Sequence, residues 1–262
     1  MEKVKPKKAL GQHFLTDENV ASRIASTIDC CPSLPVVEVG PGMGMLTKYL
    51  ISQQRDLTVI ELDTESVDYL RNNYPALSGR IVEGDFLTLD LSKFADTDGH
   101  LCVIGNYPYN ISSQIFFHIL DYKDNVTLCS GMLQREVAER IAAPEGTKTR
   151  GILSVLIQAW YDVEYLFTVS EGVFNPPPKV KSGVIRLRRN GVTDLGCDQR
   201  LFRTIVKTTF NQRRKTIRNS VKPLIPGNAA LPDNPLLALR PEQLSVSQFI
   251  SLTNYVASLR QQ

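Results

Sequence analysis

Val36-Val37-Glu38-Val39-Gly40-Pro41-Gly42-Met43-Gly44 is the stretch that decides the fold of this chain, because an apolar run there leads directly into a glycine-rich loop. The apolar run predicts a buried strand over residues 36–39, and residues 45–52 have the pattern of a helix. Glycines between a strand and a helix let the backbone turn tightly and approach a ligand closely. The stretch therefore predicts a ligand-binding strand, turn and helix at the start of an α/β domain.

Strand-like and helix-like segments alternate along the chain on both sides of this loop. Six more strands are predicted over residues 57–63, 80–83, 101–105, 126–134, 161–169 and 180–188. Helices are predicted over residues 17–29, with Thr16 as N-cap, and over 64–73, 112–120, 135–142 and 151–159. Such alternation is typical of parallel strands joined by right-handed helical crossovers. We therefore expect a Rossmann-like α/β domain with a doubly wound, mostly parallel seven-stranded sheet.

The pattern changes near Gly191. Residues 198–222 have the pattern of basic helix, residues 223–241 are rich in Pro, Leu and Asn, and residues 245–260 predict an amphipathic terminal helix. We therefore expect two domains. The first is the α/β domain over residues 1–190, with a basic N-terminal arm, and the second is a small α-helical domain over residues 191–262.

The net charge of +3 hides a segregation of charge along the chain. Residues 3–8 carry four lysines, residues 179–189 carry five basic side chains and residues 200–222 carry eight, and none of these segments contains an acid. The rest of the chain holds 13 basic against 27 acidic side chains, a net charge of −14. Three acid-free basic segments on an acidic body favour a polyanionic partner over solvated charge runs.

The composition excludes several other classes of protein. Five cysteines without C-x-x-C spacing and three scattered histidines predict neither a disulfide framework nor a metal site. No apolar run approaches the roughly 18 residues of a membrane span, and the N-terminal residues do not resemble a secretory signal. We therefore expect a cytoplasmic protein that uses no metal and contacts no membrane. Separately from the composition, we predict a monomer.

The spacing of the glycine loop favours S-adenosylmethionine over a dinucleotide. Met45 stands where the dinucleotide pattern G-x-G-x-x-G needs its last glycine, and Pro41 lacks the N–H that a pyrophosphate would bind. Glu61, at the end of the second strand, could accept hydrogen bonds from both ribose hydroxyls, and Asp85, after the third strand, could accept one from the adenine amine. Either acid could instead cap the next helix, and a nicotinamide dinucleotide stays open as the alternative ligand.

Asn106-Tyr107-Pro108-Tyr109, at the end of the predicted strand 101–105, indicates methyl transfer to a planar amine. The lone pair of an adenine amine is delocalised into the ring, so this nitrogen is a poor nucleophile. The side-chain oxygen of Asn106 and a backbone carbonyl near Tyr107 could accept its two N–H groups and disperse the positive charge that develops. Pro108 would stiffen the turn, and the Tyr109 ring could stack on the base.

Five segments of the chain together resemble the ribosomal RNA adenine N6,N6-dimethyltransferase family, in particular its bacterial branch associated with kasugamycin resistance. In chain order they are Lys8-Ala9-Leu10-Gly11-Gln12-His13-Phe14-Leu15, residues 38–44, residues 106–109, Phe174-Asn175-Pro176-Pro177-Pro178-Lys179-Val180-Lys181-Ser182 and Arg213-Arg214-Lys215-Thr216. The resemblance covers nearly the whole chain. It implies dimethylation of two adjacent adenosines in a hairpin loop near the 3′ end of 16S rRNA, coupled to maturation of the small ribosomal subunit.

The resemblance also implies which residues form the site. The residues implied to contact S-adenosylmethionine are His13, Leu15, Gly40, Gly42, Glu61, Asp85 and Asn106. The family often has Asn where this chain has His13, and it usually has Leu or Ile where this chain has Tyr107. Phe174 precedes three prolines and, with Tyr109, could grip both faces of a flipped adenine. The alternative for Phe174 is a proline-rich connection that simply ends a strand.

Basic residues from both predicted domains are assigned to contact the phosphates of RNA. They are Lys179, Lys181, Arg213, Arg214, Lys215 and Arg218. Arg214 and Arg218 lie four residues apart and are expected on one helix face. Three other functions stay open: a 23S rRNA adenine methyltransferase, a ribosome-assembly factor that binds RNA without methylating it, and a nucleotide-dependent oxidoreductase. The Arg213-Arg214-Lys215-Thr216 segment favours the small-subunit enzyme.

Overall fold

Residues 4–225 and 231–260 are described by a computed structural model. Lys3 of the basic arm and residues 226–230 of the Pro-, Leu- and Asn-rich segment lie outside the described residues. The chain forms two compact units, one running through Glu139 and including Asp162–Arg189, the other holding Arg140–Tyr161 and the residues from Asn190 onward. Residues 140–161, which the sequence places in the α/β domain, thus group with the C-terminal residues.

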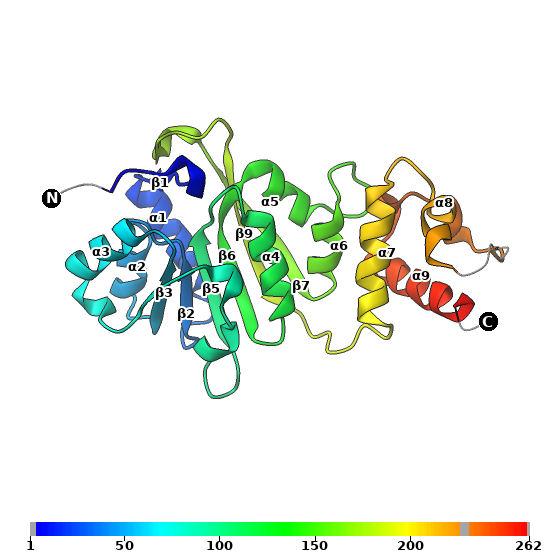
Figure 1. Cartoon of the computed structure of the whole chain (residues 1–262), viewed down its shortest axis with the longest axis horizontal. Helices are drawn as coiled ribbons and strands as arrows, with labels where there is room; N and C mark the ends of the chain where they lie inside the picture. Colours follow the sequence, from blue (N-terminus) through cyan, green and yellow to red (C-terminus); the bar gives the residue numbers. More distant parts are fainter. Residues whose placement is uncertain (1–3, 226–230, 261–262) are drawn as a thin grey trace. The chain divides into compact units, whose positions relative to one another are not determined.

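Seven strands form the sheet of the first unit, in the order β4–β3–β2–β5–β6–β9–β7 (Figure 1). Their bounds are β2 Val36–Val39, β3 Leu57–Glu61, β4 Ile81–Glu83, β5 Leu101–Asn106, β6 Val126–Gln134, β7 Tyr161–Val169 and β9 Ser182–Arg189. The five strands from β4 to β6 run parallel, and β9 is antiparallel to β6. The prediction of a mostly parallel seven-stranded sheet is confirmed.

Helices pack on the sheet through the alternating apolar positions of its strands. The helices of the first unit are α1 Glu18–Ala25, α2 Thr47–Ser52, α3 Thr64–Asn73, α4 Ser112–Asp121 and α5 Arg135–Ala142, of which the last three residues of α5 belong to the second unit. One buried cluster joins side chains of α1, α2 and α3 to alternate strand residues such as Val36, Val59 and Ile104. On the other face, Phe116 of α4 meets Tyr107 edge to face at 5.7 Å.

The topology creates a crevice at the carboxyl ends of β2 and β5. The chain passes from β2 outward to β3 and β4, then returns to the opposite side of β2 as β5. Ligands of open α/β sheets bind where the strand order reverses in this way. Gly40 directly follows β2 and Asn106 ends β5, so the two predicted ligand-binding motifs meet at this point.

A second, miniature sheet fastens the N-terminal residues to the first unit. Strand β1, Phe14–Leu15, pairs antiparallel with β8, Phe174–Asn175. The N–H and the hydroxyl of Thr16 both donate to the carbonyl of Val173, at 2.8 and 2.9 Å. Thr16 is therefore not the N-cap of α1. Asp17 takes that place, because its side chain accepts the N–H of Val20 at 2.9 Å.

The second unit is helical in its described residues. It contains α6 Ile152–Gln158, α7 Gln199–Asn211, α8 Ile217–Val221 and α9 Val246–Leu259 (Figure 1). Helices α7 and α9 pack together through Phe210 and Phe249, whose rings stack at 6.1 Å. Ser245 and Gln248 exchange hydrogen bonds in a capping box that begins α9. No helix within residues 4–225 and 231–260 is both long and apolar enough to cross a membrane.

Candidate active site

A cavity of about 400 Å³ lies at the carboxyl ends of β2, β3 and β5. This volume is in the range of roughly 300–1,000 Å³ that small-molecule sites occupy. All seven residues expected to contact the cofactor line it, and so do four of the five residues expected to act on the acceptor base, since Asn106 belongs to both sets. The lining residues from both sets are His13, Leu15, Gly40, Gly42, Glu61, Asp85, Asn106, Tyr107, Pro108 and Tyr109.

The glycine loop is shaped by a side chain that the sequence motif did not reveal. Gly42 has φ +56°, a conformation that L side chains rarely adopt. A Cβ atom there would come within 2.8 Å of the Phe14 ring. Gly42 therefore lets the N-terminal residues lie against the loop, and its N–H turns toward the carboxylate of Glu61.

Three backbone N–H groups hold the carboxylate of Glu61 in place. Oε2 accepts the N–H of Gly42 at 3.0 Å, and Oε1 accepts those of Leu62 and Asp63 at 2.9 Å each. Burial raises the pKa of Glu61, and the hydrogen bonds from Asp63 and Gly42 oppose the rise. Oε1 is already saturated, so Oε2 is the atom with capacity left for a ligand hydroxyl.

Glu38 is a second acid of the cavity, to which the sequence motif assigned no role. It is 1% exposed, lies in the middle of β2 and lines the cavity. Burial raises its pKa to about 8, and the charge of Glu61 adds to the rise. Neither Glu38 Oε2 nor Thr47 Oγ1 completes a hydrogen bond with another described residue. An acid within the apolar run Val-Val-Glu-Val was the signal that could have identified it.

Asp85 caps a short helix and also lines the cavity. Its side chain accepts the N–H of Leu87 at 2.9 Å and so caps the short 3₁₀ helix Phe86–Thr88. It also lines the cavity, beside Phe86 and Leu87. The cap fixes the direction of the carboxylate without occupying all of its acceptor sites.

The carboxamide of Asn106 is oriented by the N-terminal residues. Its Nδ2 donates to the backbone carbonyl of His13 at 3.0 Å. Within the described residues no donor reaches Oδ1, the remaining polar atom of the side chain. This contact uses the backbone of His13. It therefore does not depend on whether position 13 holds His or the Asn expected from the family resemblance.

Tyr107 points away from the cavity and into the sheet. Its side chain is 1% exposed, and its hydroxyl donates to the Ser130 carbonyl at 2.8 Å. Gly131 makes room for it, because a Cβ there would lie 2.6 Å from the ring. The larger side chain therefore occupies core space, and only the backbone of Tyr107 remains available to an acceptor base.

Tyr109 lines the cavity, and contacts to its hydroxyl and to its ring hold the side chain in place. Its hydroxyl lies 2.5 Å from Ser182 Oγ, and its ring centroid is 5.3 Å from that of His13. Burial raises the pKa of Tyr109, and the hydrogen bond with Ser182 opposes the rise. Pro108 precedes it next to the glycine loop, 3.8 Å from the position of a Cβ on Gly40.

Phe174 does not lie at the cavity. It is 4% exposed, pairs with Leu15 across the β1–β8 sheet and belongs to the buried cluster under α1. The expectation that its ring stacks on a base conflicts with this placement, because the ring already packs in the core. Its role in the fold is to anchor β8, which corresponds to the alternative in which the proline-rich segment ends a strand.

The basic residues are exposed or half-buried, but two of them do not share a helix face. Lys179, Lys181, Arg214 and Lys215 are exposed, and Arg213 pairs with Glu242 at 3.8 Å. Helix α7 ends at Asn211, and α8 begins only at Ile217 after the extended residue Thr216. The expectation that Arg214 and Arg218 lie on one helix is therefore wrong. Arg218 belongs to α8, and its Nη2 lies 3.8 Å from Oδ1 of Asp233.

The comparisons with known proteins agree on one family. The model of the ribosomal RNA adenine dimethylase family matches residues 3–258. Ribosomal RNA small subunit methyltransferase A of Parabacteroides distasonis is 65% identical over 253 residues, which cover 97% of this chain and 94% of the relative. The protein of the same name from Porphyromonas gingivalis is 56% identical over 253 residues, with coverage of 97% and 98%.

Two solved structures resemble the chain over most of its length. A dimethyladenosine transferase from Plasmodium falciparum has a TM-score of 0.76 at 21% identity, covers 92% of this chain and 96% of its own, and shows the likeness of fold. The 23S rRNA methyltransferase ErmE has a TM-score of 0.67 at 26% identity, with coverage of 92% and 99%. The chain therefore belongs to the ribosomal RNA adenine dimethylase family and is an rRNA adenine methyltransferase.

Proposed function

We propose that this chain transfers methyl groups from S-adenosylmethionine to two adjacent adenosines in a hairpin loop near the 3′ end of 16S rRNA, and dimethylates each at N6. The carboxamide of Asn106 carries this proposal. Its Nδ2 is engaged by the His13 carbonyl, so its Oδ1 is the atom presented to an incoming amine. The high identity to proteins named small subunit methyltransferase A supports the small-subunit RNA over the 23S alternative.

The chemistry follows from the electronic structure of adenine. The amine is planar because its lone pair is delocalised, and it attacks a methyl group only as that pair localises on nitrogen. Acceptors placed on its N–H groups favour the tetrahedral nitrogen and stabilise the positive charge that forms. Asn106 Oδ1 takes one N–H, and the backbone carbonyl of Tyr107 takes the other. No general base is needed, because the proton is lost after the methyl group has been transferred.

The acids of the cavity suit the methyl donor. S-adenosylmethionine supplies a methyl group on a sulfonium, together with a ribose, an adenine and an amino acid end. Glu61 Oε2 accepts from the ribose, and Asp85 accepts from the adenine amine. Glu38 Oε2 is buried at the cavity and lacks a donor, and a buried polar atom of this kind is unfavourable unless a ligand satisfies it. A cationic amino group is the donor that fits a carboxylate there.

Recognition of the RNA is assigned to exposed basic residues. Lys179 and Lys181 follow β8, and Arg214 and Lys215 form the turn after α7. These side chains neutralise phosphates, whereas the flipped base stacks on Tyr109. The region 191–262 serves as an RNA-binding domain in this proposal, and the protein acts in the cytoplasm as a monomer.

The test is to map the methylated nucleotides. The protein is incubated with labelled S-adenosylmethionine and with small subunits that lack the modification, and the labelled positions are then identified. We expect label at two adjacent adenosines near the 3′ end of 16S rRNA, four methyl groups in all. Large subunits treated in parallel serve as the control. Label in 23S rRNA alone, or no label in either, would contradict the proposed substrate.

A further inference from the structure

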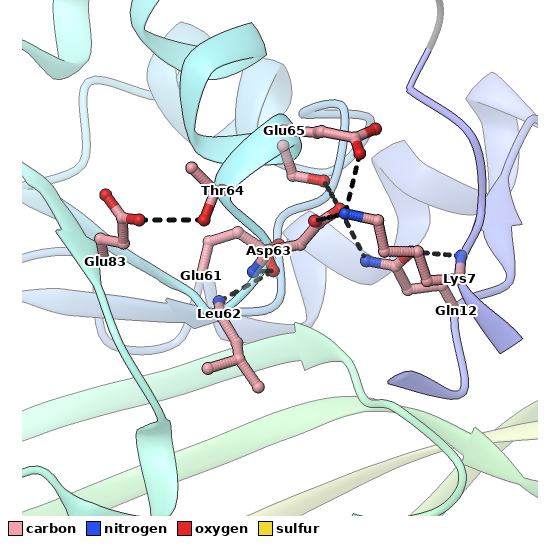
Figure 2. Close-up of polar contacts among 9 residues, drawn as sticks. Lys7, Gln12, Glu61, Leu62, Asp63, Thr64, Glu65 and Glu83 are labelled. Atoms are coloured by element: carbon pink, nitrogen blue, oxygen red, sulfur yellow. Dashed lines mark hydrogen bonds and ion pairs between the residues drawn. The ribbon is translucent and has the colours of Figure 1, made fainter. Parts of the chain in front are cut away.

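The N-terminal residues Lys7–Leu15, here called the strap, form one wall of the cavity, because residues 10–15 line it. The C-terminal end of the strap is β1, which is fastened to β8. The N-terminal end of the strap is held by side chains that contact Asp63, the second residue after β3 (Figure 2).

Asp63 gathers three side-chain donors on one buried carboxylate. Its Oδ1 accepts Lys7 Nζ at 2.5 Å, and its Oδ2 accepts Gln12 Nε2 at 3.2 Å and Ser66 Oγ at 2.9 Å (Figure 2). Lys7 also lies 3.0 Å from Glu65, and its backbone N–H donates to Gln12 Oε1 at 2.8 Å. Lys7 and Gln12 are thus joined to each other and to the same acid.

The position of Asp63 in the fold suggests that its carboxylate serves the strap. Asp63 stands at the N-cap of α3, where a carboxylate ordinarily accepts a backbone N–H of the first turn. Here the side chain makes no such bond to the helix backbone. Two of its three donors come from the strap instead. Burial raises the pKa of Asp63, but the hydrogen bonds from Lys7, Gln12 and Ser66 outweigh it, and the net pKa is lowered.

The burial of the Asp63 side chain distinguishes this cluster from an ordinary ion pair on the surface. The Lys7 side chain is 39% exposed, and a pair between two such groups contributes little to stability. The Asp63 side chain, however, is 1% exposed. A buried carboxylate that loses its partners is strongly unfavourable, so the contact is worth more than the exposure of Lys7 alone indicates.

The strap also touches both halves of the reaction site. The backbone N–H of Asp63 donates to Glu61 Oε1 at 2.9 Å, so the residue that holds the strap also helps orient the carboxylate assigned to the ribose. On the opposite side, the strap carbonyl of His13 accepts Nδ2 of Asn106. Gly11 lies so close to Asn110 that a Cβ would come within 2.5 Å of its side-chain oxygen. The strap therefore spans the crevice from β3 to β5.

We propose that Asp63, with Lys7 and Gln12, is a latch that closes the strap over the methyl donor and holds the Asn106 carboxamide in its reactive orientation. Asp63 is then a positioning residue that acts through the strap rather than on the substrate. Opening the latch frees residues 10–13 from the cavity wall while β1 stays paired with β8, so it both releases the donor and loosens the carbonyl that orients Asn106. The inference rests on the proposed function, in which the cavity holds S-adenosylmethionine.

The experiment compares the release of labelled S-adenosylmethionine after a chase with unlabelled ligand. Lys7→Met removes the charge from a partly exposed side chain, whereas Lys7→Arg keeps it, and thermal unfolding of both variants checks that the fold is retained. Asp63→Asn removes the anion itself. We expect Lys7→Met and Asp63→Asn to release the ligand about tenfold faster, the order expected for loss of one charge-assisted hydrogen bond. Lys7→Arg should restore slow release. Glu83→Gln is the matched control, because Glu83 is exposed and contacts Thr64 and Arg71 but not the strap.

Hydrogen exchange of the ligand-free protein gives a second readout. The amides of residues 10–13 should exchange faster in Lys7→Met and remain unchanged in Glu83→Gln. Single-turnover methylation with saturating donor should also slow in Lys7→Met, because Asn106 is less well held. Release and exchange within twofold of wild type in both latch variants would overturn the latch while leaving the proposed function intact. Failure of the wild type to bind S-adenosylmethionine, with faster exchange still seen in Lys7→Met, would instead overturn the proposed function and with it the gating role.

Discussion

Replacing Glu38 with Gln removes a carboxyl group that the fold holds protonated at neutral pH. Burial raises the pKa of Glu38 from 4.5 to about 8. The unfolded chain lacks this burial, so its Glu38 titrates near the ordinary value. Between these pH values the folded chain keeps a proton that the unfolded chain has released. The stability of the wild type is therefore fully present below the unfolded pKa and falls as the pH rises toward about 8.

The size of the effect follows from the two pKa values. Each unit of separation corresponds to about 1.36 kcal/mol. The separation is about 3.5 units, so the wild type should lose about 5 kcal/mol of unfolding free energy relative to Glu38→Gln across this window. Glu38 is 1% exposed, so solvent screening does not reduce the figure much. A loss of this size is a large part of the stability of a typical domain, about 5–15 kcal/mol.

Urea unfolding of both proteins between about pH 4 and 9 measures nearly the whole difference. Other titrating groups are shared by the two proteins and largely cancel in the comparison. We expect the free energy of unfolding of Glu38→Gln to change little with pH relative to wild type, and the two curves to diverge as pH rises. Parallel curves would refute the reasoning, because they would mean that Glu38 is not held neutral in the folded chain.

The same carboxyl group links binding of the methyl donor to proton release. With a pKa of about 8, roughly nine-tenths of the Glu38 groups are protonated at about pH 7. A cationic amino group bound beside Oε2 favours the ionised form, so binding should release up to about 0.9 proton. Calorimetry in buffers of different ionisation enthalpy measures this number. Equal proton release by wild type and Glu38→Gln would exclude Glu38 as the partner of that amino group.

Four further outcomes test other parts of the site. Asn106→Ala should slow single-turnover methylation by about 10²–10³ with RNA affinity nearly unchanged, and a rate within a few-fold of wild type would remove Asn106 from the chemistry. Phe174→Ala should lower the free energy of unfolding by about 3–5 kcal/mol, measured with urea, and a stability close to wild type would return the ring to a role on the base. Tyr107→Phe should cost about 1–3 kcal/mol through loss of its buried hydrogen bond but leave the affinity for S-adenosylmethionine unchanged, as calorimetry can verify. Arg214→Ala combined with Lys215→Ala should flatten the log–log salt dependence of RNA affinity by roughly 0.7–0.9 for each phosphate that is no longer neutralised, whereas an unchanged slope would identify a solvated turn.

The central strands of the sheet could be predicted from the sequence because they are buried on both faces and are largely apolar, as β2 and β6 are. The predictions over residues 36–39 and 126–134 match these strands to the residue, and that over 161–169 matches β7, although β7 is partly exposed. Helices between them follow from the crossover rule as much as from their own pattern. The miniature sheet escaped prediction. Strand β1 has two residues and pairs with β8 about 160 positions away in the sequence, so neither strand has a periodicity to detect.

Residues of the site were predicted where their chemistry is local, and missed where it depends on tertiary contacts. Glu61 ends β3 and Asp85 comes just after β4, and both face the crevice for that reason. The latch at Asp63 depends on donors more than 50 residues away, which no spacing rule links to it. The prediction for Arg214 is wrong because it extends helical periodicity across Thr216, whose extended backbone separates two helices. In each case the missing information was a contact or a backbone turn, not a residue type.

The alternation of side chains along a strand explains why Asn106 and Tyr107 lie in different surroundings. Successive side chains of a strand point to opposite faces of the sheet. Ile104 packs in the cluster with α1, so Asn106, two residues on, projects on that same side, where the strap passes. Tyr107 must then project to the other side, and there it meets Phe116. The ring of Tyr107 therefore occupies the space above Gly131 and leaves only its backbone to the crevice.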